Sequence, residues 1–242
     1  MVTYGELLEI IGYTLVENDM TETICRHMDE YRGEYTNSIF GLFLEISKGL
    51  GLVCKGIEMQ AFVQVGTLLR QLYEQIATAI VLHNHPETRK TFNDLSKIKT
   101  ELITTNKDKN DASEALYNQK KDLISGKPKS LRDFLEYGWL LEIEECHSLG
   151  SKELLKQANL YDIVPWKEFF NNFVHNKILV IQMTDEGMSF YTNEFIYHAA
   201  IIFDRFMCAY HQATDYNFHI AGRSVRFDFE NCFNEITKQR KS

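Results

Sequence analysis

Apolar residues recur along most of the chain at spacings of three and four, which is the period of an α-helix. The pattern is clearest in Ile57–Leu82, where one wide apolar stripe is formed by Phe62, Val65, Leu69, Leu72, Tyr73, Ile76 and Ile80. The remaining arc of this segment is polar and includes Glu74 and, at its edge, Arg70. We therefore expect a long central helix on which Arg70 and Glu74 are half buried.

The same period, together with helix start and stop signals, predicts further helices. They cover Tyr4–Glu17, about Thr21 to Leu50 with a break near Gly33 or Gly41, Pro86 to about Thr104, Leu131–Leu141 after a cap at Ser130, Lys152–Asn159 after a cap at Ser151, Trp166–Val174 after Pro165, Thr192–His211, and Ser224–Ile236 before a frayed basic tail. We expect an all-α protein with about seven to nine helices.

Two segments interrupt this pattern. Residues 97–132 contain loop-like polar stretches around a helix centred on Leu116, and nine lysines or arginines stand there against five acidic residues. We expect this segment to protrude as a basic helical hairpin. Residues 178–191 favour either a short β-hairpin or an extended connection.

Composition sets the scale of the fold and limits its partners. A chain of 242 residues with 44% hydrophobic content can bury a sizeable core, and we expect a single helical domain over 1–242. The formal net charge of −8 argues against a protein that coats nucleic acid with its whole surface. Any RNA contact must then be local, and the basic segment 97–132 is its expected place.

The cysteines and the apolar runs indicate the compartment. Five cysteines are widely dispersed and form no Cys-x-x-Cys pair, which argues against a disulfide framework and a zinc finger. No stretch approaches the roughly 20 apolar residues that a membrane helix requires. We therefore expect a cytoplasmic protein that does not contact a membrane.

The segment Phe169–Lys177 gathers amides and a histidine beside aromatic residues. Histidine exchanges protons near neutral pH, and amides can orient a substrate, so Asn171, Asn172, His175 and Asn176 form a candidate polar site. The alternative is that these side chains only cap a helix that ends near Val174.

Arg70 and Glu74 allow two interpretations as well. Their spacing of four residues is that of an ordinary helix ion pair, which contributes only a few tenths of a kcal/mol when exposed. In the functional interpretation, Glu74 holds a partly desolvated Arg70 so that its guanidinium faces His175 and offers a fixed cation to phosphate.

Two short motifs carry a family resemblance. They are Leu-Leu-Arg-Gln-Leu-Tyr-Glu at 68–74 and Trp-Lys-Glu-Phe-Phe-Asn-Asn-Phe-Val-His at 166–175. Together they resemble a family of uncharacterised bacterial helical proteins, which are in turn similar to the HEPN superfamily of all-helical ribonucleases and toxins. The resemblance implies a HEPN-like helical bundle, cleavage of RNA without a metal, and a site at a homodimer interface.

The motif departs from the HEPN pattern at one position. HEPN nucleases carry an arginine, a polar residue and then a histidine; aligning His175 with that histidine places Asn171 at the polar position and Phe170 at the arginine. The resemblance therefore implies a catalytic His175 and Asn171, with Arg70 replacing the missing cation in space, or else an inactive site. Arg205 and His211 match the spacing literally, but about one such match is expected by chance.

No motif implies a cofactor or a metal. His83 and His85 flank a helix end and have no third ligand at a matching spacing, and the acidic run around Glu144 is typical of a solvated face.

Two functions remain open. The first is a metal-independent ribonuclease or toxin-type effector of prokaryotic defence, with His175, Asn171 and Arg70 as catalytic residues and with Asn172, Glu74, Asn176, Arg205 and His211 as binding candidates. Its expected partners are RNA, a second copy of the chain, and an antitoxin or defence protein. The second is a non-catalytic helical module that binds a protein or a nucleotide-like ligand.

Overall fold

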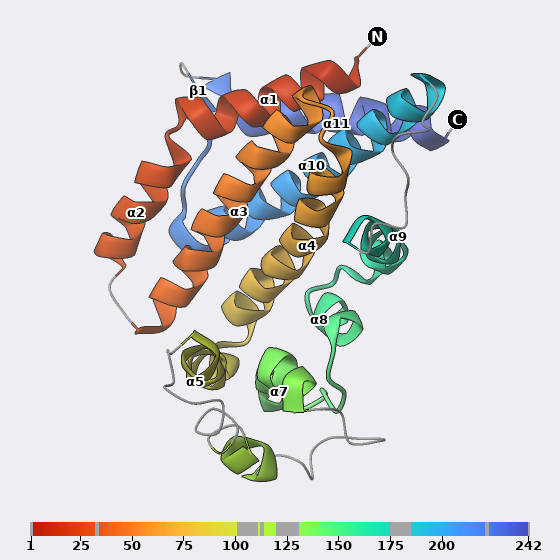
Figure 1. Cartoon of the computed structure of the whole chain (residues 1–242). Helices are drawn as coiled ribbons and strands as arrows, with labels where there is room; N and C mark the ends of the chain where they lie inside the picture. Colours follow the sequence, from red (N-terminus) through yellow and green to blue (C-terminus); the bar gives the residue numbers. More distant parts are fainter. Residues whose placement is uncertain are drawn as a thin grey trace. The chain divides into compact units, whose positions relative to one another are not determined.

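The computed structural model describes residues 2–31, 34–100, 111, 114–119, 131–174, 185–220 and 223–241. Helices dominate this part of the chain (Figure 1), which confirms the all-α class. The exception among the described residues is a two-residue antiparallel pair, β1 (His219–Ile220) with β2 (Arg223–Ser224). None of the helices in the described ranges is both long and apolar enough to cross a membrane.

The chain forms two compact units. The first unit comprises Met1–Arg32, Phe40–Ile76 and Pro165–Ser242, and the second comprises Gly33–Ile39 and Ala77–Val164. This division is finer than the single domain expected from the sequence. The helices that contribute to the first unit are α1 (Tyr4–Glu17), α2 (Met20–Glu30), α3 (Glu34–Glu58), α4 (Phe62–Asn84), α9 (Val164–Val174), α10 (Asp185–Thr214) and α11 (Val225–Lys241).

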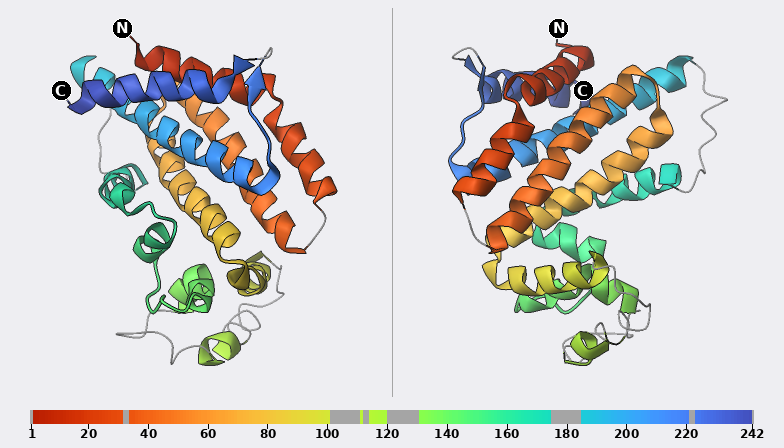
Figure 2. Two further views of the ribbon diagram at one scale, coloured as in Figure 1. Left: turned by 180° about the vertical axis from the view of Figure 1, so that it is seen from behind. Right: turned by 60° about the vertical axis from the view of Figure 1, so that its left-hand side comes forward.

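Helix α1 has the bounds predicted from the sequence. Thr3 caps it: its hydroxyl accepts the N–H of Glu6 at 3.2 Å, while the Glu6 carboxylate accepts the N–H of Thr3 at 2.7 Å. This reciprocal capping box satisfies two backbone donors that the helix leaves without partners. The helix packs on α10 and α11 (Figure 2) and buries Leu7, Ile11 and Leu15.

Helices α3 and α4 lie antiparallel and in close contact (Figure 1). A Cβ atom added at Gly49 would lie 2.6 Å from Leu72, and one added at Gly56 would lie 2.6 Å from Val65. Only glycine permits backbones to approach so closely. The apolar stripe predicted for the central helix faces the core, since Leu69 and Ile76 are fully buried.

The predicted start of the central helix, Ile57, is wrong: the helix begins at Phe62. Ile57 belongs to α3, which ends at Glu58, and α4 begins at Phe62. Between them Gln60 adopts a left-handed φ of 55°, which ends a helix and reverses the chain. The apolar period runs through this turn, so the pattern alone could not locate it. The break predicted near Gly33, by contrast, agrees with the bounds of α2 and α3.

Helix α10 is longer than predicted at both ends. Residues 185–191 are its first turns, so a β-hairpin over 178–191 is wrong for them; 178–184 lie outside the described residues. Asp185 and Glu186 stand in the first turn, where negative charge is favourable to the helix dipole.

The C-terminal residues are helical and held in place, so the predicted frayed tail is wrong. Helix α11 continues to Lys241. Arg240 donates two hydrogen bonds to Glu194 on α10, at 2.8 and 2.9 Å, and its guanidinium carbon lies 4.1 Å from the centre of the Tyr197 ring. A bidentate pair of this kind fixes both side chains, and it ties the last turn of α11 to α10.

The second unit contains shorter elements. They are the 3₁₀ turns η1 (Pro86–Thr88), η3 (Gly138–Glu142) and η4 (Tyr161–Ile163), and the helices α5 (Arg89–Thr100), α7 (Leu131–Tyr137) and α8 (Ser151–Gln157). Trp139 and Phe134 are buried in this unit, and the Trp139 ring meets Phe92 edge to face. Arg89 donates to the carbonyls of Leu82 and His83, at 2.6 and 3.1 Å, and so satisfies the end of α4.

Two predicted caps and the predicted hairpin have different outcomes. Gly150, not Ser151, is the N-cap of α8, and no side chain caps this helix. Ser130 lies outside the described residues. Of the segment 97–132, residues 114–119 are helical, 97–100 end α5 and 131–132 begin α7, while most of the rest lies outside the described residues.

Candidate functional site

The first unit brings together the two segments that carry the sequence motifs. Nε of Arg70 on α4 donates a hydrogen bond of 2.7 Å to Oδ1 of Asn171 on α9, across 101 positions of sequence. The two helices approach closely at Gly66, where a Cβ atom would lie 2.5 Å from the Phe173 ring. The packing of α4 on α9 therefore positions Arg70 beside Asn171.

Glu74 lies between two cations. Its Oε2 is 3.5 Å from Nη1 of Arg70, and its Oε1 is 2.6 Å from Nζ of Lys167 on α9. Lys167 and Asn171 are one helical turn apart and share a face of α9. We call Arg70, Glu74, Lys167 and Asn171 the Arg70 cluster.

The sequence motifs predicted three of these four residues, and Lys167 was missed. The signal for it was present, because Lys167 precedes Asn171 by four positions and a lysine on a half-buried helix face needs a carboxylate partner.

Burial differs within the cluster. The side chains of Arg70 and Glu74 are 28% and 22% exposed, which confirms that both are half buried, whereas that of Lys167 is only 9% exposed. A buried ammonium group is costly unless it is paired, and the carboxylate of Glu74 offsets this cost for Lys167. Arg70 is therefore the more exposed of the two cations.

The chemistry available to the cluster is that of an anion site. Two cations and one carboxylate leave a positive balance, and in the described part of the chain Nη2 of Arg70 has no hydrogen-bond partner. A guanidinium binds phosphate or carboxylate oxygens through its planar donors. Arg70 can therefore hold an anion while Nε keeps its bond to Asn171.

Phe170 explains why an arginine is absent from its own position in the motif. Its side chain is fully buried and its ring meets those of Tyr73, Phe195 and His198 at centroid distances of 6.2, 6.0 and 5.1 Å. An arginine there would place an unpaired charge in an aromatic core, at a cost of several kcal/mol. The cation next to Asn171 comes from α4 instead.

The remaining predicted residues are placed as follows. Asn172 is half buried on α9. His175 and Asn176 follow α9 and lie outside the described residues. Arg205 is exposed on α10, and Nδ1 of His211 donates to the carbonyl of Tyr216 at 3.0 Å, just beyond the end of the same helix. The bond of His211 is that of a helix-end cap.

A buried histidine lies beneath the Arg70 cluster and was missed by the sequence motifs. His198 on α10 is fully buried, its Nδ1 shares a hydrogen bond with the hydroxyl of Tyr73, and its ring lies 4.5 Å from that of Trp166. Tyr73 and Trp166 each directly precede a cluster residue. Burial, with the positive charge of Arg240, lowers the pKa of His198 to about 3.

The lowered pKa keeps His198 neutral at physiological pH. In the described chain its Nε2 has no hydrogen-bond partner, and Oε2 of Glu194 is 3.9 Å away. The sequence signal was its place on the apolar face of α10, three residues after the buried Phe195.

His83 and His85 lie at the end of α4. Nδ1 of His85 lies 3.1 Å from Glu87, while burial and the nearby Arg89 lower the pKa of His83. Among the residues described by the structure, no group of three or more histidine, cysteine or carboxylate side chains is placed to hold a metal ion.

The chain was also compared with known proteins. No protein-family model, no curated protein and no solved structure matches it.

Proposed function

We propose that this chain is a HEPN-like helical protein that cleaves RNA without a metal, as a ribonuclease or toxin-type effector of prokaryotic defence. The hydrogen bond between Arg70 Nε and Asn171 Oδ1 carries the proposal. It brings the guanidinium of a half-buried arginine next to Asn171, the polar residue of the motif, and so supports Arg70 as a substitute for the arginine that the motif lacks.

The role of Arg70 follows from the charge that develops during cleavage. When a hydroxyl oxygen attacks a phosphodiester, negative charge grows on the phosphate oxygens, and a fixed cation lowers the barrier by stabilising that charge. Glu74 and Asn171 hold the guanidinium, so little reorganisation is needed when the substrate binds. Asn171, with Asn172 on the same helix, orients phosphate or ribose.

The proton transfer is assigned to His175. As general base it takes the proton of the ribose 2′-hydroxyl, whose oxygen then bonds to phosphorus while the bond to the 5′-oxygen breaks. Water supplies the proton that the departing 5′-oxygen takes up, the other product ends in a 2′,3′-cyclic phosphate, and protonated His175 returns its proton to solvent. Buried His198 cannot take this role, because its lowered pKa leaves it a weak base.

The partners follow from the same proposal. RNA is gathered by the basic segment 97–132, a second copy of the chain completes the site, and an antitoxin or defence protein controls it in the cytoplasm. Electrostatic attraction by a local basic segment suits an otherwise acidic protein, because phosphate contacts dominate the affinity for RNA.

The test is an RNA cleavage assay in EDTA with the wild type, Arg70→Ala, Arg70→Lys and His175→Ala. We expect Arg70→Ala and His175→Ala to lower the rate at least roughly a hundredfold. Arg70→Lys keeps the charge but loses the planar donors, so its rate should lie between that of the wild type and that of Arg70→Ala. Circular dichroism checks that each variant is folded.

Two results would contradict the assignment. One is a wild type that cuts no RNA in any buffer or as a dimer, and the other is a His175→Ala variant that cuts as fast as the wild type. A wild type that binds RNA without cutting it, through Arg70, supports the second function, a non-catalytic binding module. The buried Phe170 favours that function, since it removes the usual arginine from the motif.

A further inference from the structure

Helix α1 is apolar around most of its circumference. It turns Leu7 and Ile11 into the core, yet Tyr13 and Val16 on its other side are 53% and 74% exposed. A helix that is apolar on all sides is normally buried on all sides. The exposed face of α1 is therefore typical of a surface that a partner covers.

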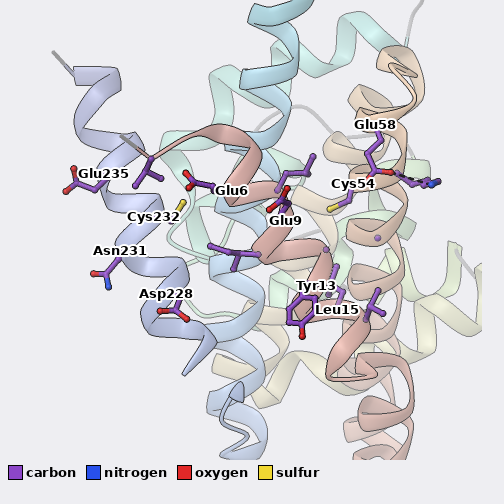
Figure 3. A pocket seen from close by; sticks show the side chains of 17 residues that line it. Glu6, Glu9, Tyr13, Leu15, Cys54, Glu58, Asp228, Asn231, Cys232 and Glu235 are labelled. Atoms are coloured by element: carbon purple, nitrogen blue, oxygen red, sulfur yellow. Dashed lines mark hydrogen bonds and ion pairs between the residues drawn. The ribbon is translucent and has the colours of Figure 1, made fainter. Parts of the chain in front are cut away.

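This face forms the middle of a groove. Figure 3 shows α1 between α11 and α3, with side chains of all three helices around a hollow of about 1140 Å³. That volume holds about two turns of a helix roughly 10 Å across. The hollow is lined by Ile10 and Val16 of α1 and by Cys54 of α3. Gly12 and Gly51 open it further, since a Cβ atom added at either would meet nothing within 4 Å.

The rim of the groove is acidic. One lysine, Lys55, lines it and lies 3.4 Å from Glu58. Five carboxylates line it, and they come from all three helices: Glu6, Glu9, Glu58, Asp228 and Glu235. An apolar floor between carboxylates is complementary to a segment with an apolar stripe and basic flanks.

We propose that this groove binds a basic amphipathic helix of another protein. A two-fold contact between copies would bring the same carboxylates face to face, which is unfavourable. Anionic lipid is repelled by the same rim. The Arg70 cluster contributes no residue to the groove, so the proposal stands apart from the RNA site.

The experiment uses three synthetic peptides of about 18 residues with helical spacing. The first places leucine on one face and lysine on the other, the second replaces lysine by glutamate, and the third replaces leucine by serine. Fluorescence anisotropy at physiological salt measures their binding to the full chain. We expect the Lys/Leu peptide to bind at least roughly tenfold more tightly than the other two, because only it matches both the floor and the rim.

Matched variants locate the binding. Gly12→Leu fills the groove and should weaken the Lys/Leu peptide by at least roughly tenfold. Gly41→Leu is its control, because a Cβ atom at this glycine of α3 also meets nothing within 4 Å and Gly41 does not line the groove. Glu9→Lys should weaken binding as well, whereas Glu45→Lys, exposed on α3 outside the groove, changes net charge equally and should have little effect.

Each contrary result overturns the proposal. Equal effects of Gly12→Leu and Gly41→Leu, or of Glu9→Lys and Glu45→Lys, mean that the peptide does not bind in the groove. Equal binding of the Lys/Ser peptide means that charge alone attracts it. A wild-type oligomer in sedimentation that Gly12→Leu dissociates assigns the groove to a second copy. Binding to vesicles of phosphatidylserine and phosphatidylcholine that Gly12→Leu abolishes assigns it to a membrane.

Discussion

Two of the arginine–glutamate pairs in the first unit, Arg240–Glu194 and Arg70–Glu74, differ in geometry and in the burial of the glutamate. Arg240 donates two short hydrogen bonds to Glu194, whose side chain is 6% exposed. Arg70 makes one contact of 3.5 Å with Glu74, whose side chain is 22% exposed and which also pairs with Lys167. Arg240 binds one carboxylate with both Nη1 and Nη2. Arg70 uses Nε and Nη1, which leaves Nη2 for a ligand.

The comparison separates a structural pair from a candidate binding pair by their bonding capacity. A bidentate arginine directs both of its terminal nitrogens at one carboxylate, as Arg240 does with Glu194. A guanidinium held at Nε by an amide, and only loosely at Nη1, is oriented but not saturated. The same residue types therefore suit different tasks, and the outcome depends on the helices that surround them.

The largest effect is expected for Arg240→Ala. It leaves the carboxylate of Glu194 buried next to neutral His198, and breaking a buried pair in this way costs about 3–5 kcal/mol of the free energy of unfolding. Urea denaturation followed by circular dichroism measures it. Lys238→Ala on the same helix is the control, because its partner Glu235 is exposed and the pair contributes less than about 1 kcal/mol. Similar losses for the two variants would mean that the Arg240 pair does not hold α11.

The second effect concerns pH. His198 is neutral in the fold, with its pKa lowered from 6.5 to about 3, but it takes up a proton in the unfolded chain. The unfolded state therefore binds more protons between these values, so this stability is complete above pH 6.5 and is lost as the pH falls toward 3. The slope is at most about 1.4 kcal/mol per pH unit. The polar and titratable side chains near the ring include Tyr73, Glu194, Arg240 and Tyr197.

Denaturant titrations between pH 7 and 5 test this pH effect. We expect the wild type to lose up to about 2 kcal/mol of unfolding free energy over this range. His198→Gln cannot be protonated at this position. Its unfolding free energy should therefore fall less over this pH range than that of the wild type, and the difference should be the part that protonation of His198 contributes. Parallel curves for the two proteins would show that His198 is not the group responsible.

The sequence predicted the helices better than their contacts. The stripe of α4, both ends of α1 and the half-buried state of Arg70 followed from the helical period, because that period reflects local geometry. The turn at Gln60 did not, since no proline or glycine marks it within an unbroken apolar pattern. The bidentate bond of Arg240 did not either, because its partner lies 46 positions away and the basic end of a chain looks solvated.

For the candidate site too, the sequence predicted individual residues but not the contacts between them. Arg70 and Asn171 were selected from separate motifs, but their contact depends on the close approach of α4 and α9 at Gly66, a tertiary feature. Lys167 and His198 were missed because their signals, a spacing of four from Asn171 and a place on an apolar helix face, are common and do not by themselves distinguish a site residue. The groove beside α1 was missed because exposure depends on which faces other helices cover.

The smallest effect on stability is expected for Arg70→Ala, and it is the sharpest test of the comparison. Glu74 keeps its bond of 2.6 Å to Lys167, so the substitution strands no buried charge, and the free energy of unfolding should fall by only about 1 kcal/mol. RNA cleavage or RNA binding should fall by at least roughly a hundredfold in the same preparation. The contrary result is that Arg70→Ala destabilises the protein as much as Arg240→Ala and leaves RNA cleavage and binding unchanged. Arg70 and Glu74 would then be a second structural pair, and the Arg70 cluster would not be the site of the RNA chemistry.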